Sequence, residues 1–340
     1  MWFKKRAAPC FPLWIVLALG LPAASQAAPF SERPDVRKFI ARMVSHHGFD
    51  AAELKNQFSQ VKPRPRIAKT MTGQHVRPPR WTAYRANFVN PRNIARGVAF
   101  WNDHAGTLAR ARENYGIPEE IVVAILGVET QYGRFPLPYR VMDSLSTLAF
   151  DYPRRADFFR GELEQFLLLM REEGRNPLRL KGSYAGAMGI PQFMPSSYRN
   201  YAVDFDGDGR RDLLHSAGDA IGSVANFLHE HGWIPGEPVA TRAIPHGEAD
   251  AGEMAASGLK PEWPIGELLE RRIEPAEPLP PNARVAVLAM EADGALEYWL
   301  GLNNFYVITR YNRSQSYALA VFQLGGEIRA AREQAALPEP

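Results

Sequence analysis

The 340-residue sequence predicts an α+β protein that is mainly helical and carries a small antiparallel β insert. Every residue from 121 to 128, within the stretch 117–133, is apolar or glycine, and residues 158–170 repeat apolar side chains at helical spacing. Within residues 235–302, which are rich in Pro and Gly, two strand-like runs flank Asp293 and Gly294, a pair typical of a hairpin turn. The first two patterns predict helices, and the third predicts the insert.

The chain opens with the pattern of a secretory signal peptide, residues 1–28. Basic residues at positions 4–6 precede the apolar run Leu13–Leu21 and then the small residues AASQAA. The apolar run is too short to span a bilayer. The only cysteine, Cys10, lies before this run, so it cannot be a lipid-modified first residue of the mature protein. We therefore expect an exported, soluble mature chain with no retained membrane anchor.

The charge of the mature chain gives no indication of a nucleic-acid partner. The formal net charge of +3 falls to near zero once the basic residues of the leader are removed, and no basic stripe remains. Because the mature chain has no cysteine, its stability must come from its core, which a chain of about 310 residues can supply.

The first part of the mature chain predicts helices separated by one irregular loop. Helical spacing begins at Asp35, and Asp50 with Glu53 forms a plausible capping box for the next helix. Residues 62–81 are rich in proline and arginine and predict an ordered loop. A single long helix is expected over residues 90–115.

The apolar helix that follows places one carboxyl group at the edge of a core. Pro118 suits its first position and Gly133 its end. Burial disfavours a carboxylate, so the pKa of Glu129 should rise, and a protonated Glu129 can act as a general acid. The alternative is a structural glutamate that is bonded to an arginine or a backbone amide.

A second amphipathic helix carries a pair of arginines at its start. Arg154 and Arg155 stand where the helix dipole disfavours cations, so they require an anionic ligand or Glu129 as partner, unless they are simply solvated. The apolar stripe of this helix consists of Phe158, Phe159, Leu163, Phe166, Leu167 and Met170, and Gly174 ends it.

The stretch from 181 to 203 has the composition of a carbohydrate groove. Small residues, amide and hydroxyl groups and flat aromatic rings suit a ligand with polar rims and apolar faces. Packing of the aromatics in the core is the alternative. The residues concerned are Gly182, Ser183, Tyr184, Gly186, Gly189, Gln192, Phe193 and Tyr198.

An EF-hand-like loop is expected over residues 204–219. Loop positions 1, 3, 5, 6 and 9 match Asp204, Asp206, Asp208, Gly209 and Asp212, and the Arg210 carbonyl suits position 7. Position 12 is His215, a poor ligand for calcium, so we expect a longer loop closed by Asp219 at the N-cap of the next helix. The alternative is an acidic turn without a metal.

Several blocks of this sequence resemble the lytic murein transglycosylase B family. The resemblance implies a lysozyme-like helical catalytic region over 29–234, completed by a helical segment over 303–335, with the β-containing insert over 235–302 between them. The blocks are GVETQYG, SLSTLAFDYPRRADFF, GELEQFLLL, LKGSYAGAMGIPQFMPSSYRNYAVDFDGDG, DAIGSVANFLHEHGW and NFYVITRYNRS.

The resemblance also implies the roles of individual residues. Glu129 falls at the position of the catalytic acid. A structural Ca²⁺ is implied, held by Asp204, Asp206, Asp208, the carbonyl of Arg210 and Asp219, and no organic cofactor. The residues implied to line the glycan cleft are Tyr84, Arg154, Arg155, Ser183, Gln192, Phe193, Tyr306 and Tyr311.

Three features depart from the family pattern. Phe227 stands where a tyrosine is common, and the calcium loop is one residue longer before Asp219. No cysteine follows the signal run, which indicates a soluble, periplasmic version. The partners implied are peptidoglycan glycan strands and other cell-wall enzymes.

The implied reaction uses one carboxyl group. Glu129 would protonate the oxygen between N-acetylmuramic acid and N-acetylglucosamine, and the 6-hydroxyl would then close on C1 to give a 1,6-anhydro end without consuming water. Ordinary glycosidases need two carboxyl groups, and Asp143, Asp151 and Asp157 lack a comparably apolar setting. The alternatives are a hydrolytic muramidase and a murein-binding scaffold without turnover.

Overall fold

The computed structural model describes residues 29–73, 80–246 and 251–336, so the predicted signal peptide lies outside the described residues. The helices are η1 (Phe30–Glu32), α1 (Pro34–His47), α2 (Ala51–Ser59), α3 (Pro65–Gly73), α4 (Trp81–Phe88), α5 (Pro91–Asp103), α6 (Ala105–Tyr115), α7 (Glu119–Thr130), α8 (Val141–Asp151), η2 (Pro153–Arg155), α9 (Ala156–Glu172), α10 (Pro195–Tyr201), α11 (Ala217–Glu230), α12 (Ala251–Ala255), α13 (Ile265–Glu270), α14 (Asn303–Tyr311) and α15 (Gln315–Ala335). The strands are β1 (Tyr139–Arg140), β2 (Lys181–Gly182), β3 (Ala240–Pro245), β4 (Trp263–Pro264), β5 (Ile273–Pro275), β6 (Arg284–Ala292) and β7 (Ala295–Gly301).

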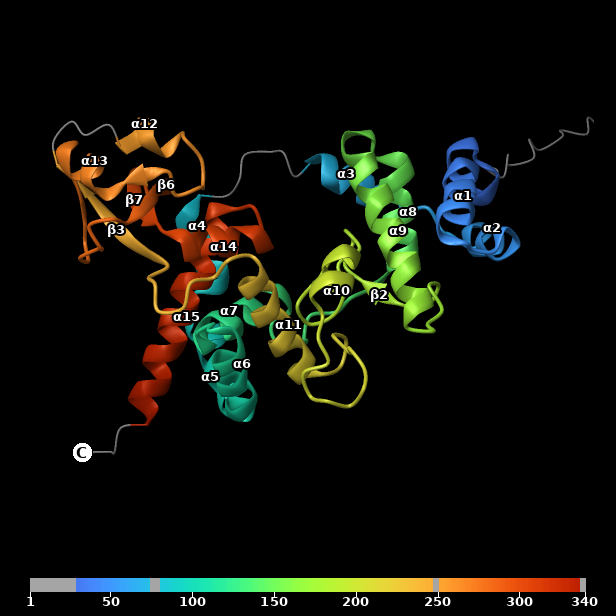
Figure 1. The fold of residues 1–340 in the computed structure, drawn as a ribbon. Helices are drawn as coiled ribbons and strands as arrows, with labels where there is room; N and C mark the ends of the chain where they lie inside the picture. The colour runs from blue at the N-terminus through green and yellow to red at the C-terminus, as the bar shows by residue number, and fades with distance from the viewer. Residues whose placement is uncertain (1–28, 74–79, 247–250, 337–340) are drawn as a thin grey trace, which may run out of the picture.

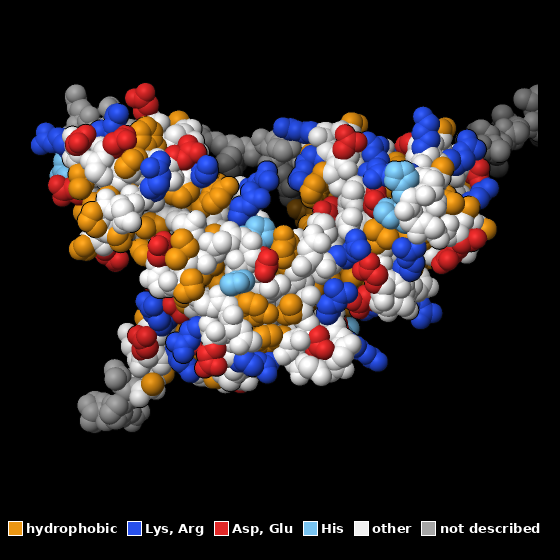
Figure 2. All heavy atoms as spheres, in the orientation of Figure 1, with side chains coloured by type: hydrophobic (Ala, Val, Ile, Leu, Met, Phe, Trp, Pro, Cys, Tyr) orange, Lys and Arg blue, Asp and Glu red, His pale blue; other side chains and the backbone are white. Residues whose placement is uncertain are grey.

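The predicted mainly helical α+β class is confirmed. The apolar helix α7 packs against α5, α6, α11 and the long C-terminal helix α15. The larger sheet lies at one end of the molecule and α1 with α2 at the other, with α7 between them (Figure 1). Within the described ranges, no helix combines the length and the apolar character needed to cross a membrane. On the face drawn in Figure 2, basic and acidic side chains are intermixed rather than gathered by sign.

The β insert is larger than one hairpin. Strands β6 and β7 form the predicted hairpin, with Ala292 paired to Ala295 and Gly294 at a φ of 87° in the turn. Three further strands extend it to an antiparallel sheet in the order β4-β6-β7-β3-β5. Ile265, Leu268 and other buried residues of this part form a core separate from that of the helices.

Two predictions in the N-terminal half were wrong. The expected loop over 62–81 contains α3, in which Pro65 holds the first position and Ile67 is buried; residues 74–79 of that stretch lie outside the described residues. The expected single helix over 90–115 is interrupted at His104, whose φ of −122° leaves the helical region and whose ring packs on Phe100.

Helices α7 and α9, which the sequence predicted from their apolar residues, also differ in detail from those predictions. Helix α7 ends at Thr130 rather than at Gly133, and Pro118 is its N-cap rather than its first residue. In α9, Phe158 is 41% exposed and does not belong to the buried stripe. Its ring lies under the guanidinium of Arg155, 4.1 Å from the ring centroid, so a cation–π contact takes the place of core packing.

Candidate active site

Glu129 lies in the last turn of α7, where the buried helix reaches the surface. Residues Ile121–Leu126 are buried, whereas Glu129 is half-buried. Burial raises the pKa of its carboxyl group to about 7, as predicted, although a hydrogen bond from Tyr317 lowers that pKa. Glu129 is therefore largely enclosed, with part of the residue's surface still exposed.

The hydrogen-bond partner of Glu129 is Tyr317, a residue that the sequence did not single out. The Tyr317 hydroxyl donates to Oε1 of Glu129 over 2.7 Å. Tyr317 is buried in the first turn of α15, which Ser314 caps. Burial first, and then the carboxyl of Glu129, raise the pKa of Tyr317 well above its ordinary value, so it remains a donor. The one sequence feature that could have drawn attention to Tyr317 is its position as a lone tyrosine among the small and apolar residues of SYALAVFQL.

Two further tyrosines lie close to Glu129. The ring of Tyr311 stacks on that of Tyr317 with a centroid distance of 6.4 Å and an interplanar angle of 9°. Burial and then the charge of Glu129 raise the pKa of both Tyr311 and Tyr84. The structure thus brings together three of the residues predicted for the cleft region, Glu129, Tyr84 and Tyr311, and adds Tyr317.

The end of α7 is fastened to the glycine-rich loop. Gln131, Tyr132 and Gly133 have positive φ values of 50°, 63° and 76°, which turn the chain sharply after the helix. The Thr130 hydroxyl donates to the carbonyl of Ile190 over 2.7 Å and accepts from the amide of Gly133 at 2.9 Å. These bonds fix Glu129 relative to the loop that follows β2.

Glycines give this loop its shape. A Cβ atom at Gly186 would collide with Leu145, and one at Gly189 with the carbonyl of Leu213. Gln192 has a φ of 53° and donates from Nε2 to the carbonyl of Gly189 over 2.9 Å. The loop is therefore held by close backbone approach and by its own side chains.

A pocket of about 340 Å³ collects several of the predicted cleft residues. Gln192, Phe193 and Tyr311 line it, and the Tyr311 hydroxyl donates to the carbonyl of Pro191. Phe193 is only 2% exposed, so the alternative of core packing holds for most of its ring. Ser183 is half-buried, and its hydroxyl accepts from the amide of Ala187.

Three predicted residues are not brought to Glu129 by any described contact. Arg154 and Arg155 are exposed on η2, and no cation among the described residues contributes to the pKa of Glu129. Of the alternatives for these arginines, a pair with Glu129 is therefore not supported, and an anionic ligand or simple solvation remains. Tyr306 is half-buried on α14, and its described bonds stay within that helix.

The other carboxyl groups considered are bound elsewhere. Asp143 is fully buried but pairs with Arg140 and Arg64. Asp151 pairs with Arg33, and the side chain of Asp157 is 98% exposed. No second carboxylate among the described residues acts on the pKa of Glu129.

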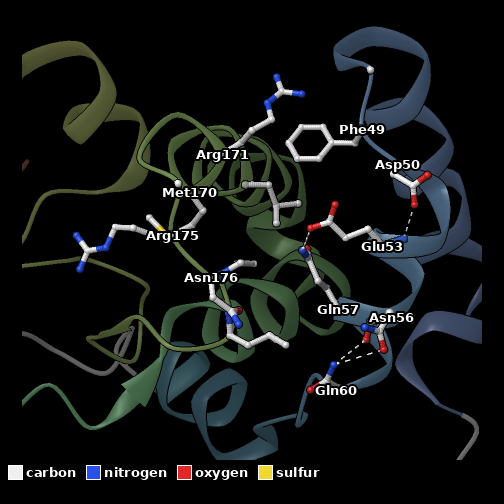
Figure 3. Close-up of a pocket in the computed structure, with 15 residues that line it drawn as sticks. Phe49, Asp50, Glu53, Asn56, Gln57, Gln60, Met170, Arg171, Arg175 and Asn176 are labelled. Carbon is white, nitrogen blue, oxygen red and sulfur yellow. Dashed lines mark hydrogen bonds between the residues drawn. The ribbon is translucent and has the colours of Figure 1, made fainter.

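The larger cavity of about 760 Å³ lies away from this chemistry. It opens between α2 and the end of α9, where Glu53 and Gln57 face Met170 and Arg171 (Figure 3). Arg171 donates to the carbonyl of His47. Neither Glu129 nor its neighbours Tyr311 and Tyr317 line this cavity, whereas Tyr311 lines the smaller pocket. Size alone therefore does not make the larger cavity the active site.

The acidic loop after α10 gathers three of its four predicted carboxylates. Oxygen atoms of Asp204, Asp206 and Asp219 lie within 4.8 Å of one another. Asp219 is fully buried and accepts from the amides of Phe205 and Asp212. It is the third residue of α11, and the N-cap is Ser216, so the predicted cap was wrong. The carboxylate of Asp208 stays outside the group.

This donor set fits a hard cation. Positive φ values at Gly207 and Gly209, 82° and 85°, let the chain wrap tightly. None of Asp204, Asp206 and Asp219 forms a salt bridge with a described residue. His215 bonds to Asp212 at 2.9 Å instead of closing the loop. Three uncompensated carboxylates are typical of a calcium loop.

Comparison with known proteins gives the family. The family model described as "Transglycosylase SLT domain" matches residues 31–326. The membrane-bound lytic murein transglycosylase B of Escherichia coli (strain K12) is 41% identical over 366 residues, which cover 98% of this chain and 100% of that protein.

Two solved structures share the fold. The soluble lytic transglycosylase SltB1 from Pseudomonas aeruginosa has a TM-score of 0.83 and 49% identity, covering 88% of this chain and 100% of that chain. The Escherichia coli lytic transglycosylase Slt35 in complex with calcium has a TM-score of 0.81 and 45% identity, covering 90% of this chain and 96% of that chain. The chain belongs to the transglycosylase SLT domain family and is a lytic transglycosylase that cleaves peptidoglycan.

Proposed function

We propose that Glu129 is the single catalytic carboxyl group and that it acts first as general acid and then as general base. The observation that carries this proposal is its setting at the end of an apolar helix. Because the pKa of Glu129 is about 7, a large fraction of the enzyme molecules carries a proton on this residue at neutral pH. That value also makes the carboxylate a competent base after the proton has left.

The reaction then needs no water. Glu129 gives its proton to the oxygen that leaves with N-acetylglucosamine as the bond from C1 of N-acetylmuramic acid breaks. The carbonyl oxygen of the 2-acetamido group bonds to C1 and carries the positive charge. The carboxylate of Glu129 next removes the proton of the 6-hydroxyl, whose oxygen attacks C1 and displaces the acetamido oxygen. The product is a 1,6-anhydro end, and Glu129 has regained its proton.

Tyr317 serves as a positioning residue in this scheme. Its hydroxyl stabilises the carboxylate form of Glu129 and holds Oε1 in place. Its buried position and its stacking on Tyr311 keep the donor fixed. The same bond keeps the pKa of Glu129 below the value that burial alone would give.

The glycan strand lies along the surface around Glu129. Tyr84 and Tyr311 support this placement, because both lie near enough to Glu129 for its charge to raise the pKa of their hydroxyl groups. The remaining cleft residues are proposed from the family pattern. All are exposed or half-buried except Phe193, which is buried and would form the floor of the cleft. They are Arg154, Arg155, Ser183, Gln192, Phe193 and Tyr306.

Calcium is proposed as a structural ion of the loop. Asp204, Asp206 and Asp219 would hold it, with Asp208 and the carbonyl of Arg210 completing the oxygen ligands. The bound ion would neutralise the carboxylates that the loop brings together. The calcium complex of the similar Slt35 structure supports this proposal.

We further propose export to the periplasm and no retained anchor, on the pattern of residues 1–28. Other cell-wall enzymes remain proposed partners beside the glycan strands. The division into a catalytic region over 29–234 and 303–335 and an insert over 235–302 is supported by the separate core of the sheet.

The test of the central role is digestion of purified murein by a Glu129→Gln variant. The amide keeps the shape but has no proton to give, so we expect a loss of about 3 orders of magnitude or more in kcat. Glu120→Gln is the matched control, because Glu120 lies at the start of the same helix and pairs with Arg329. Activity near wild type in Glu129→Gln would contradict the proposal.

A further inference from the structure

The pocket next to Tyr311 has an aromatic floor that continues from the site of Glu129. The ring of Tyr311, already stacked on Tyr317, packs on Phe227 at 4.9 Å, and Phe227 stacks on His231 at 4.0 Å. Tyr201 packs on both Phe227 and His231 at 5.0 Å. This row of rings leads from the hydrogen-bond partner of Glu129 into the pocket.

Two arginines stand at the rim of this pocket without a partner. Arg310 and Arg313 line it, both are exposed, and neither side chain forms a hydrogen bond or ion pair with any described residue. Nearby guanidinium groups are compensated, since Arg199 pairs with Glu172 and Arg211 with Glu173. Unpaired arginines beside a hollow suggest a ligand that brings the anion.

The lining of the pocket contains no acid that would offset these charges. Apart from the two arginines and the aromatic floor, it consists of Gln192, Met194, Ser196, Ser197 and Asn200. The His231 ring donates from Nδ1 to the carbonyl of Phe227 over 2.7 Å, which fixes its orientation. The pocket therefore combines two free cations, amide and hydroxyl groups and flat apolar faces.

The substrate carries its negative charge in one place. The sugar rings of peptidoglycan are neutral when the lactyl group of N-acetylmuramic acid is joined to its stem peptide, and the carboxylates lie on that peptide. A guanidinium binds a carboxylate through paired hydrogen bonds. We propose that Arg310 and Arg313 form a subsite for the carboxylates of the stem peptide on a muramic acid residue bound beside Glu129.

This proposal rests on the proposed function and deepens it, because it names the part of the substrate that the pocket recognises. Exposed ion pairs are weak in open water. Here the aromatic floor removes water from one side of the ligand, which strengthens the attraction. The subsite would contribute to substrate binding rather than to the chemical step, so it should act on KM and leave kcat nearly unchanged.

The experiment compares two substrates that differ only in charge. Both are glycan strands with acetylated amino groups on their stem peptides; in one, the carboxylates have also been converted to carboxamides by carbodiimide coupling to ammonia. The double variant Arg310→Gln, Arg313→Gln is compared with wild type and with Arg92→Gln. Arg92 is an exposed arginine of α5 without an ion pair to a described residue.

On the carboxylate strands, we expect the double variant to raise KM by about tenfold, with kcat within about twofold of wild type. On the carboxamide strands, the double variant and wild type should be equal. Wild type should prefer the carboxylate strands, and Arg92→Gln should behave as wild type throughout. An equal loss on both substrates, or no loss on either, would overturn the proposal.

A binding experiment tests the subsite independently of catalytic turnover. The Glu129→Gln variant, with and without the two arginine substitutions, is titrated calorimetrically with a disaccharide-peptide and with its carboxamide form. The proposal expects tighter binding of the carboxylate form only when both arginines are present. If wild type cleaves neither strand but this preference is found, the proposed reaction fails and the subsite stands. Equal binding of the two forms overturns the subsite whatever the turnover.

Discussion

The hydroxyl of Tyr317 donates a hydrogen bond to Oε1 of Glu129 over 2.7 Å, and this bond joins the first turn of α15 to the last turn of α7. The two residues are far apart in the sequence; Glu129 is half-buried at the end of the apolar helix α7, and Tyr317 is buried. Burial raises the pKa of Glu129 and the hydrogen bond lowers it, so the two effects oppose each other at the proposed acid. Their balance determines the pH range in which Glu129 is protonated.

Replacement of Tyr317 by Phe should raise the pKa of Glu129, because the variant loses the donor that stabilises the carboxylate. The acid form would then persist to higher pH. We expect the alkaline limb of the pH profile of kcat/KM to move upward and kcat at its optimum to fall by about tenfold. The measurement is the rate of soluble product release from murein over a range of pH values.

Tyr298→Phe serves as the control for that profile, because Tyr298 lies on β7 in the separate core of the sheet. It should leave the alkaline limb in place. An unchanged or lowered limb in Tyr317→Phe would mean that Tyr317 does not act on the protonation of Glu129.

Glu129→Gln should be more stable than wild type at alkaline pH. The pKa of Glu129 is raised from 4.5 to about 7 by folding. Its contribution to stability is therefore fully present below pH 4.5 and is lost as pH rises through 7. The stability gain of the neutral variant should grow across this window towards an upper bound of about 3 kcal/mol. Denaturant unfolding at pH 4 and pH 8 measures it, and equal differences at both values would contradict a buried, proton-holding Glu129.

Added calcium should raise the melting temperature, since the ion binds the folded loop better than the unfolded chain. At a concentration of about 100 times Kd, the gain is about 3 kcal/mol. Magnesium should do less because it demands a smaller, stricter octahedral site. Asp206→Asn should lose the response and Asp103→Asn, at the exposed end of α5, should keep it. Equal shifts with both ions would show that the loop is only an acidic turn.

The sequence predicted the features whose signals are local. Apolar composition identified α7 and placed Glu129 at its end, and the side chain of Asp50 caps its helix as expected. Asp293 and Gly294 predicted their hairpin. Each of these predictions depends on a few neighbouring residues.

The features that were missed depend on contacts that sequence spacing does not reveal, most of them between residues distant in the chain. Tyr317 lies on one face of a helix that looks like any packing helix, and only the meeting of α15 with α7 gives it a role. Phe158 was assigned to the core because spacing alone does not show that Arg155 covers its ring. Asp143 is buried because two arginines, one of them the distant Arg64, compensate it. Such pairings are set by tertiary structure and have no sequence period.

The most direct test of the account is digestion of purified murein in ¹⁸O-labelled water, followed by mass measurement of the cleaved muramic acid ends. One carboxyl group with the substrate's own 6-hydroxyl as nucleophile predicts ends that are one water lighter than hydrolysis products, lack a reducing group and contain no label. A hydrolase would place the heavy oxygen at C1. Reducing ends that carry solvent oxygen as the main product would contradict the one-carboxylate mechanism, even if Glu129 proved essential.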